Sequence, residues 1–275
     1  MKKTVFAAAL LVGLTAGQSY ALTIDFNYQT PTDGSAKTSV FVNSDNTATG
    51  GYFIETFDKP GSLAQTISIP GGTVQIAAGG GFNSLNPATD LQITAGTSIG
   101  IQKGSNSSGA APAGDTTFYA YGPGSNSGSA VSLRVNYDDF LAAIPGYYLS
   151  YLGMYYGSID TYNNIAFYNG AQLFQGTGLL ADGILSGTEI LAAMNGTSGN
   201  QFQPGSNVYV NLSFDPSESF TAFEFRTTGI AFEVDNIVSG FAPAPVPEPS
   251  TMMLLGLGMF GLAVYGKRRM DSNKA

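Results

Sequence analysis

Carboxylates are the side chains of this sequence best suited to chemistry, because the chain contains no histidine and no cysteine. Their absence excludes a Ser-His-Asp hydrolase, a thiol nucleophile and an ordinary zinc or iron–sulfur site. Five carboxylates lie in or beside strand-like segments and could border one groove: Glu55, Asp160, Glu224, Glu233 and Asp235. A glycosidase needs two such groups flanking a sugar. Because acidic residues occur throughout this chain, we interpret these five as solvated side chains on the outward faces of strands. We therefore predict no catalytic residue and no enzyme.

Tyrosines concentrate in one stretch of the chain. If this stretch is a strand, Tyr147, Tyr151 and Tyr155 share one face, while Tyr148 and Tyr156 share the other. A tyrosine ring has an apolar face and a polar tip, which suits stacking on sugar rings. The predicted glycan-stacking residues are Tyr151, Tyr155, Tyr156 and Tyr162. The alternative is that the rings pack in the core and at the edges of a tyrosine-rich sandwich.

The elements that must position these side chains are mostly strands. Several segments alternate with a period of two, as in Val208–Phe214, which indicates antiparallel strands with one face on a core. We predict one mostly β domain over residues 22–241, an antiparallel sandwich of jelly-roll-like form. The expected strands are Thr23–Tyr28, Thr38–Val42, Tyr52–Phe57, Gln65–Ile69, Thr73–Ala77, Val131–Tyr137, Tyr147–Tyr155, Ile165–Tyr168, Asn207–Phe214, Phe220–Arg226 and Ile230–Val238.

Helix signals in this domain are few. Ser186 and Glu189 form a capping box ahead of an apolar run that Asn195 and Gly196 close. The segment Tyr137–Ala143 favours one further helical turn. The domain is therefore expected to carry one or two short helices.

The N-terminus reads as a secretory signal peptide over residues 1–21. Lys2 and Lys3 precede the apolar run Val5–Ala16, and small residues end at Ala21, where we expect cleavage. This arrangement predicts export through the Sec translocon and cleavage by signal peptidase.

The C-terminus has three parts. A proline-rich linker covers residues 242–249, and an uncharged, mostly apolar run follows over residues 250–266. Seventeen residues is at the short end of a membrane-spanning helix, and Lys267, Arg268 and Arg269 form the positive flank expected on its cytoplasmic side. We predict a transmembrane helix over 250–266, an inner-membrane anchor, with a basic cytoplasmic tail over 267–275.

This tail resembles the PEP-CTERM sorting signal of bacterial envelope proteins, also known as the ice-binding protein C-terminal domain. The resemblance rests on Val246, Pro247, Glu248 and Pro249, on the apolar run and on the basic cluster. It implies that the tail holds the precursor in the inner membrane. An exosortase would then cut near Pro247–Pro249 and release the domain to the cell surface.

Three stretches of the domain, in this order, resemble a group of PEP-CTERM surface proteins with a jelly-roll-like ectodomain. They are residues 111–117, residues 157–168 and residues 231–237. Asp115, Asp160 and Asp235 lie in them, and carboxylates with amide or backbone oxygens suit a structural calcium ion. Neither EF-hand nor repeat-in-toxin spacing is present. Calcium at these aspartates is therefore a hypothesis, and no other cofactor is predicted.

The net charge of the β domain limits the classes of partner that it can bind. Residues 22–241 carry 5 cationic and 17 acidic side chains, a net charge of −12, which excludes a nucleic-acid binder. We expect an exported cell-surface or extracellular-matrix protein, structural or adhesive in association with exopolysaccharide or biofilm. The alternatives are a carbohydrate-binding module and a carboxylate-dependent glycan hydrolase or lyase.

Overall fold

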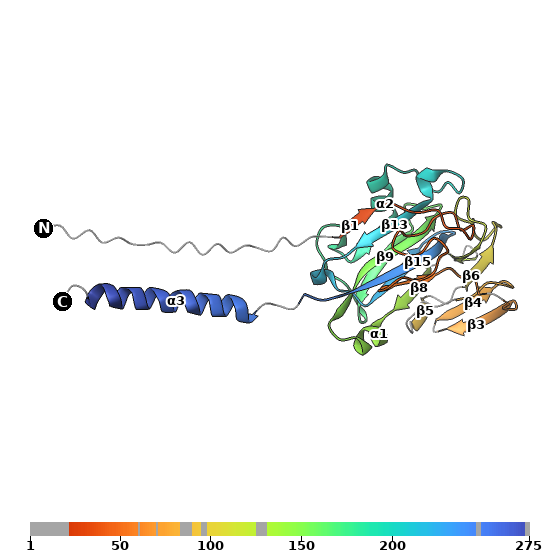
Figure 1. Cartoon of the computed structure of the whole chain (residues 1–275). Coiled ribbons are helices and arrows are strands. Elements are labelled where there is room, and N and C mark those ends of the chain that lie inside the picture. The colour runs from red at the N-terminus through yellow and green to blue at the C-terminus, as the bar shows by residue number, and fades with distance from the viewer. Residues whose placement is uncertain are drawn as a thin grey trace. The chain divides into compact units, whose positions relative to one another are not determined.

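The computed structural model describes residues 22–59, 61–69, 71–82, 90–94, 98–124, 131–245 and 249–272. The chain forms two units, of which the first ends at Ala242 and the second begins at Pro243 (Figure 1). The predicted signal peptide, residues 1–21, lies outside the described residues.

Two sheets make up the first unit. Nine strands form one sheet in the order β1-β13-β9-β15-β7-β6-β4-β3, with β2 paired to β15. Six strands form the other in the order β11-β10-β14-β8-β5, with β12 paired to β10. The strands of the nine-stranded sheet are β1 (Thr23–Asp25), β2 (Tyr52–Glu55), β3 (Gln65–Ile69), β4 (Gly72–Ile76), β6 (Ser98–Lys103), β7 (Phe118–Gly122), β9 (Tyr147–Gly157), β13 (Val208–Ser213) and β15 (Phe232–Pro243). The strands of the six-stranded sheet are β5 (Asp90–Thr94), β8 (Val131–Asn136), β10 (Asn164–Asn169), β11 (Gln172–Leu173), β12 (Ile184–Leu185) and β14 (Ala222–Thr227).

The core lies between the two sheets, because alternate side chains of both sheets are buried there. In β13, Val208 and Leu212 face this core, as the period of two requires. The ring of Phe225 on β14 meets Tyr156 of β9 and Phe232 of β15, with centroids 6.0 Å and 5.6 Å apart. The sheets therefore pack face to face, and the prediction of a mostly β fold is confirmed. Its jelly-roll-like form stays a prediction.

The neighbouring strands β4 and β6 depart from the antiparallel arrangement that the sequence predicted. β4 and β6 run parallel, with Val74 opposite Ile99. Between them the chain crosses to the other sheet, where β5 pairs with β8. Because the chain makes this crossover instead of a hairpin turn, it returns in its original direction.

Two short helices lie where they were predicted. α1 covers Asp138–Ala143 and α2 covers Gly187–Met194. At the start of α2, the Ser186 hydroxyl accepts a hydrogen bond from the Glu189 backbone, and the Glu189 carboxylate accepts one from the Ser186 backbone. This capping box is predictable from the sequence alone, because all of its partners lie within four residues.

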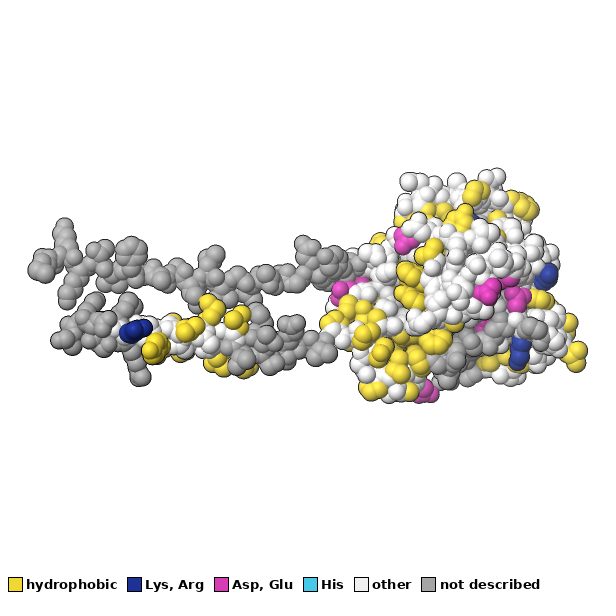
Figure 2. All heavy atoms as spheres, in the orientation of Figure 1, with side chains coloured by type: hydrophobic (Ala, Val, Ile, Leu, Met, Phe, Trp, Pro, Cys, Tyr) yellow, Lys and Arg dark blue, Asp and Glu magenta, His cyan; other side chains and the backbone are white. Residues whose placement is uncertain are grey.

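Aromatic side chains surround the end of β15. Phe241 lies 4.8 Å from Phe140 of α1 and 6.0 Å from Phe53 of β2, measured between ring centroids. Figure 2 shows hydrophobic side chains gathered on the surface over α1. These rings fix the last strand of the first unit to its neighbours.

The second unit consists largely of α3, which covers Pro249–Ser272. Within the part of the chain that the structure describes, no helix combines the length and the apolar character that a membrane crossing requires. The segment 250–266 is helical, as predicted, and its role as a transmembrane helix stays a prediction.

Candidate functional site

The outer face of the nine-stranded sheet, turned away from the core, carries most of the candidate residues. Tyr151 and Tyr155 of β9 and Glu233 and Asp235 of β15 alternate with core positions and point to this face. The face is closed to solvent, since none of these four residues is more than 3% exposed. Loops cover it, and the Tyr155 hydroxyl donates a hydrogen bond to the carbonyl of Ala113 in one of them.

This closure corrects the predicted glycan-stacking set. Tyr151 and Tyr155 are buried beneath the loops, and Tyr156 is buried in the core, so none of the three rings offers a free face to a sugar. Tyr162 is partly exposed, and its hydroxyl donates to Asp160 Oδ2 at 2.6 Å. The packing alternative therefore describes three of the four tyrosines.

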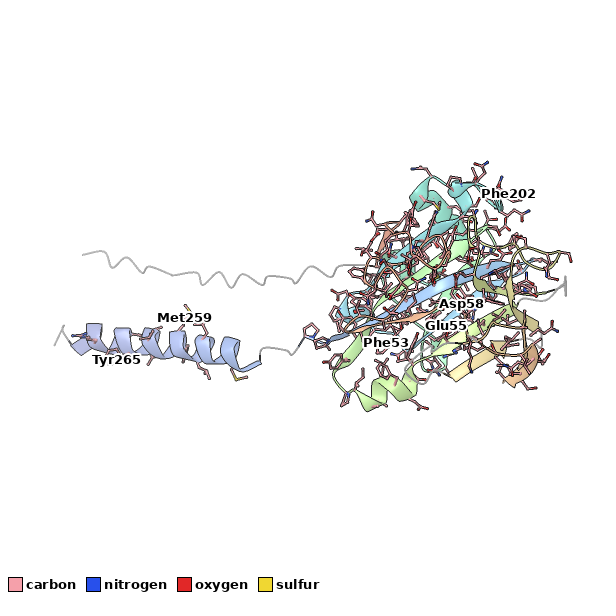
Figure 3. All side chains as sticks on the ribbon, turned by 45° about the vertical axis from the view of Figure 1, so that its right-hand side comes forward. Phe53, Glu55, Asp58, Phe202, Met259 and Tyr265 are labelled. Atoms are coloured by element: carbon pink, nitrogen blue, oxygen red, sulfur yellow. The ribbon has the colours of Figure 1, made fainter. Side chains whose placement is uncertain are left out.

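The five carboxylates that could border one groove are also dispersed. Glu224 lies on β14 of the other sheet, where it forms an ion pair with Arg226. Glu55, at the end of β2 (Figure 3), accepts a hydrogen bond from the Phe57 backbone at 2.6 Å. Of the five, Asp160 and Glu233 line one common pocket.

That pocket is polar, has a volume of about 240 Å³ and opens beyond the end of β9. Its walls come from loops that follow β6, β9 and α2, from the residues before β15 and from the start of β15 itself. The lining residues are Asn106, Ser107, Gly109, Ala110, Ser158, Asp160, Gly199, Gln201, Ile230, Ala231 and Glu233. Amide, hydroxyl, carboxylate and backbone groups predominate, so the pocket is suited to a ligand rich in hydrogen-bonding groups.

Two donors hold Glu233 in this wall. Its Oε1 accepts from the Ala110 backbone at 3.0 Å, and its Oε2 accepts from the Ser158 hydroxyl at 2.6 Å. Burial raises the pKa of Glu233 to about 7 against these two hydrogen bonds, and the charge of Asp160 adds to the rise. Both carboxylate oxygens already have protein partners, which disfavours Glu233 as a proton donor to a ligand.

Asp160 is fixed by two hydroxyls on the other side of the pocket. Its Oδ1 accepts from Ser198 at 2.9 Å and its Oδ2 accepts from Tyr162. Gly199 gives the carboxylate room, because its backbone has a φ of +67° and a Cβ there would lie 2.4 Å from Asp160 Oδ1. The loop after α2 therefore requires glycine at this position.

An exposed ring follows directly on a pocket residue. Gln201 lines the pocket, and its neighbour Phe202 is 77% exposed (Figure 3). An accessible ring beside hydrogen-bonding side chains suits contact with a sugar. Neither residue was predicted from the sequence, because a single aromatic residue in a loop carries no periodic signal.

A second acidic site lies where β15 changes its partner. β15 pairs with β7 as far as Val234 and with β2 from Ile237 onward, so Asp235 stands in the gap between the two partners. Asp115, from the segment before β7, reaches the same gap. The Thr117 hydroxyl lies 2.7 Å from Asp115 Oδ1 and 3.3 Å from Asp235 Oδ2.

Burial dominates the electrostatics of this aspartate pair. It raises the pKa of Asp115 to about 6 and that of Asp235 well above its usual value. The charge of Asp115 and its hydrogen bond with Asp235 raise the pKa of Asp235 further, whereas the same hydrogen bond lowers the pKa of Asp115. Asp160 lies in the polar pocket instead, so the structure does not assemble the three aspartates into one calcium site. Among the described side chains, no group of three or more acidic residues is arranged to hold a metal ion.

The sorting tail lies in the second unit. Val246, Pro247 and Glu248 lie outside the described residues, and Pro249 begins α3. Lys267 and Arg269 are exposed near the end of this helix, while the side chain of Arg268 lies outside the described residues.

Comparison with known proteins gives one match. Residues 245–269 match the family model of the PEP-CTERM protein-sorting motif. The chain matches no curated protein and no solved structure. The match confirms the resemblance of the tail and supports exosortase-dependent sorting of an exported protein.

Proposed function

Because the chain carries a PEP-CTERM protein-sorting motif over residues 245–269, we propose that it is an exported structural or adhesive protein of the cell surface or extracellular matrix. In this proposal the signal peptide directs the chain through the Sec translocon. The α3 segment then holds the precursor in the inner membrane, with its basic end in the cytoplasm. An exosortase cuts near Pro247–Pro249 and delivers the β domain to the surface.

The sorting step has a direct test in cells of the producing bacterium. Replacing Pro247, Glu248 and Pro249 by alanine is expected to leave uncut precursor in the membrane fraction, because the processing enzyme no longer finds its recognition segment. Pro243→Ala, a proline outside the matched residues, is the control and is expected to be processed normally. Immunoblots of membrane and released fractions give the readout. Unchanged processing of the triple variant would contradict the proposal.

Association with exopolysaccharide is the finer part of the proposal, and the polar pocket carries it. The pocket presents amides, hydroxyls and a carboxylate to a ligand, and Phe202, which follows the lining residue Gln201 in the chain, carries an exposed ring. A domain with a net charge of −12 repels acidic partners, so neutral glycans fit it better than anionic ones.

Binding to the bacterium's own purified polysaccharide tests this part. Asp160→Asn and Phe202→Ala are each expected to weaken binding about tenfold, since each removes a charged hydrogen-bond acceptor or a ring contact. Tyr147→Ala is the matched control: it removes a 48% exposed ring at the start of β9, whereas the pocket lies beyond the strand's end. Equal binding by all variants, or no binding by the wild type, would contradict a glycan role for the pocket.

A glycan hydrolase or lyase is the second candidate, because Asp160 and Glu233 line one pocket. We favour binding over catalysis, since Glu233 is 3% exposed and both of its oxygens accept hydrogen bonds from the protein. Reducing-end release from the polysaccharide distinguishes the two. We expect none; release by the wild type that disappears in Glu233→Gln would establish the enzyme instead.

A further inference from the structure

The gap in the pairing of β15 contains two buried carboxylates that share one hydroxyl group. Asp235 is fully buried and Asp115 is 8% exposed. Thr117 has a single hydroxyl proton, which serves both carboxylates: the hydroxyl donates to Asp115 Oδ1 at 2.7 Å and lies 3.3 Å from Asp235 Oδ2. Asp115 Oδ2 and Asp235 Oδ1 are buried and accept no hydrogen bond from another residue, and the two carboxyl groups are close enough to share a proton with each other. An ionised pair in this state is strongly destabilising.

No basic side chain compensates the two carboxylates among the described contacts. Lys37 lies in the same loop layer but donates to the Asn207 carbonyl, and Lys103 acts on Asp58. The groups that interact electrostatically with the pair are all acidic or phenolic: Asp58, Tyr119, Tyr155 and Tyr209. The charge of the pair is therefore offset either by a proton or by a bound cation.

A pocket of about 450 Å³ lies beside the pair. Thr117 forms part of its wall, whereas the two aspartates lie behind it. Asp33, Asp45 and Asp58 also line it, together with Lys103 (Figure 3 labels Asp58). Three carboxylates against one lysine give this pocket a negative potential, which concentrates cations next to the pair.

We propose that Asp115 and Asp235, with the Thr117 hydroxyl between them, bind a calcium ion. The two carboxylates match its double charge, and every available donor is an oxygen, as calcium prefers. The two oxygens without partners, Asp115 Oδ2 and Asp235 Oδ1, become its first ligands. Because the site has only two carboxylates, its remaining ligands are neutral oxygens or water. Calcium accepts such mixed and irregular oxygen sets, whereas magnesium demands a near-ideal octahedron.

Calcium titration of the full chain, after treatment with EDTA and dialysis, tests the proposal. We expect saturable heat of binding in calorimetry, with a dissociation constant of about 10⁻⁵–10⁻³ M. We also expect the Tm to rise by about 3–6 °C at a calcium concentration tenfold above that constant. Sodium chloride at matched ionic strength and magnesium chloride at matched concentration are the control salts and are expected to give a smaller shift.

Two variants separate a bound ion from a mere packing role. Asp235→Asn and Asp115→Asn keep the side-chain shape and remove one charge each, and both are expected to abolish the calcium response. Without calcium, Asp235→Asn is expected to melt no lower than the wild type, because it removes a buried charge. This second measurement shows that the variant folds. Asp139→Asn, at an exposed position of α1, is the matched control and is expected to keep the full calcium shift.

Three results would overturn the site. The first is a wild type that shows neither binding heat nor a calcium-specific rise in Tm, which would mean that the two aspartates share a proton. The second is an equal rise with the sodium or magnesium control. The third is a calcium response that survives in both Asp235→Asn and Asp115→Asn.

Discussion

Glu233 and Asp235 stand two residues apart on the same face of β15, yet their surroundings differ in kind. Glu233 has a donor for each of its oxygens and borders the polar pocket. Asp235 faces a second carboxylate, and its Oδ1 has no partner. The strand gives the two residues the same orientation, so the difference comes from the loops above them.

The loops that cover the outer face decide whether a buried carboxylate of β15 has hydrogen-bond donors. Over Glu233 the loop after β6 supplies a backbone N–H from Ala110, and the loop after β9 supplies the Ser158 hydroxyl. Over Asp235 the segment before β7 supplies another acid and a single hydroxyl. The first arrangement is satisfied without a ligand, and the second is not.

The largest expected effect is the pH dependence that Glu233 confers on stability. Its raised pKa means that the folded chain holds a proton which the unfolded chain releases near pH 4.5. The bound proton stabilises the folded chain fully below pH 4.5, and this stabilisation is lost as the pH rises through about 7. The free energy of unfolding then falls by about 3 kcal/mol. Urea unfolding at pH 4.5–8 measures it. Glu233→Gln is expected to lose this part of the slope, and identical slopes would show that Glu233 is not buried as described.

Thr117→Val is expected to reduce the free energy of unfolding by about 2 kcal/mol, measured by urea denaturation without added calcium. The change keeps the shape of the side chain and removes the hydroxyl that contacts both aspartates. Thr116→Val is the control, since its hydroxyl donates to the Gly34 carbonyl at an exposed position. If the two variants lose the same stability, the Thr117 hydroxyl has no special part in the pair.

Ser158→Ala is expected to have the smallest effect, a decrease of about 1 kcal/mol in the free energy of unfolding, measured by urea denaturation. It removes one of two donors to Glu233, so the pKa of Glu233 is expected to rise further, and the pH at which stability falls moves up with it. Ser198→Ala, which removes a donor to Asp160 at an exposed position, is the control. A downward shift in the pH profile would contradict the assignment of this hydrogen bond.

Features of the fold that depend on near neighbours were predictable from the sequence. The capping box of α2 and the alternation of β13 involve partners a few residues apart. The parallel pair β4 and β6 was not predictable, because it depends on β5 crossing to the other sheet. The expected strand Thr38–Val42 forms only a single bridge, between Thr38 and Gln29, since this segment belongs to the loops over the outer face.

The candidate sites were likewise predictable only where their residues are close together in the sequence. Alternation placed Tyr151 and Tyr155 on one face of a strand but could not show that Ser39 and Ala113, from loops far along the chain, contact their hydroxyls. Asp115 and Asp235 come together from distant parts of the sequence, whereas Asp160 lies in the polar pocket. The tail is the exception, because the residues of its motif are contiguous and the sequence alone is enough to identify it.

The strand that leads into the sorting tail has neighbours on both edges: β9 on one, and β7 followed by β2 on the other. Tension on the tail therefore enters the domain along the axis of β15. The hydrogen bonds of an antiparallel pair run perpendicular to the strand, so a force along the strand loads them together, in shear. The rings of Phe140 and Phe53 pack against Phe241 near the end of β15. A pull on the C-terminal end of the domain would therefore act on the hydrogen bonds along both edges of β15 at once.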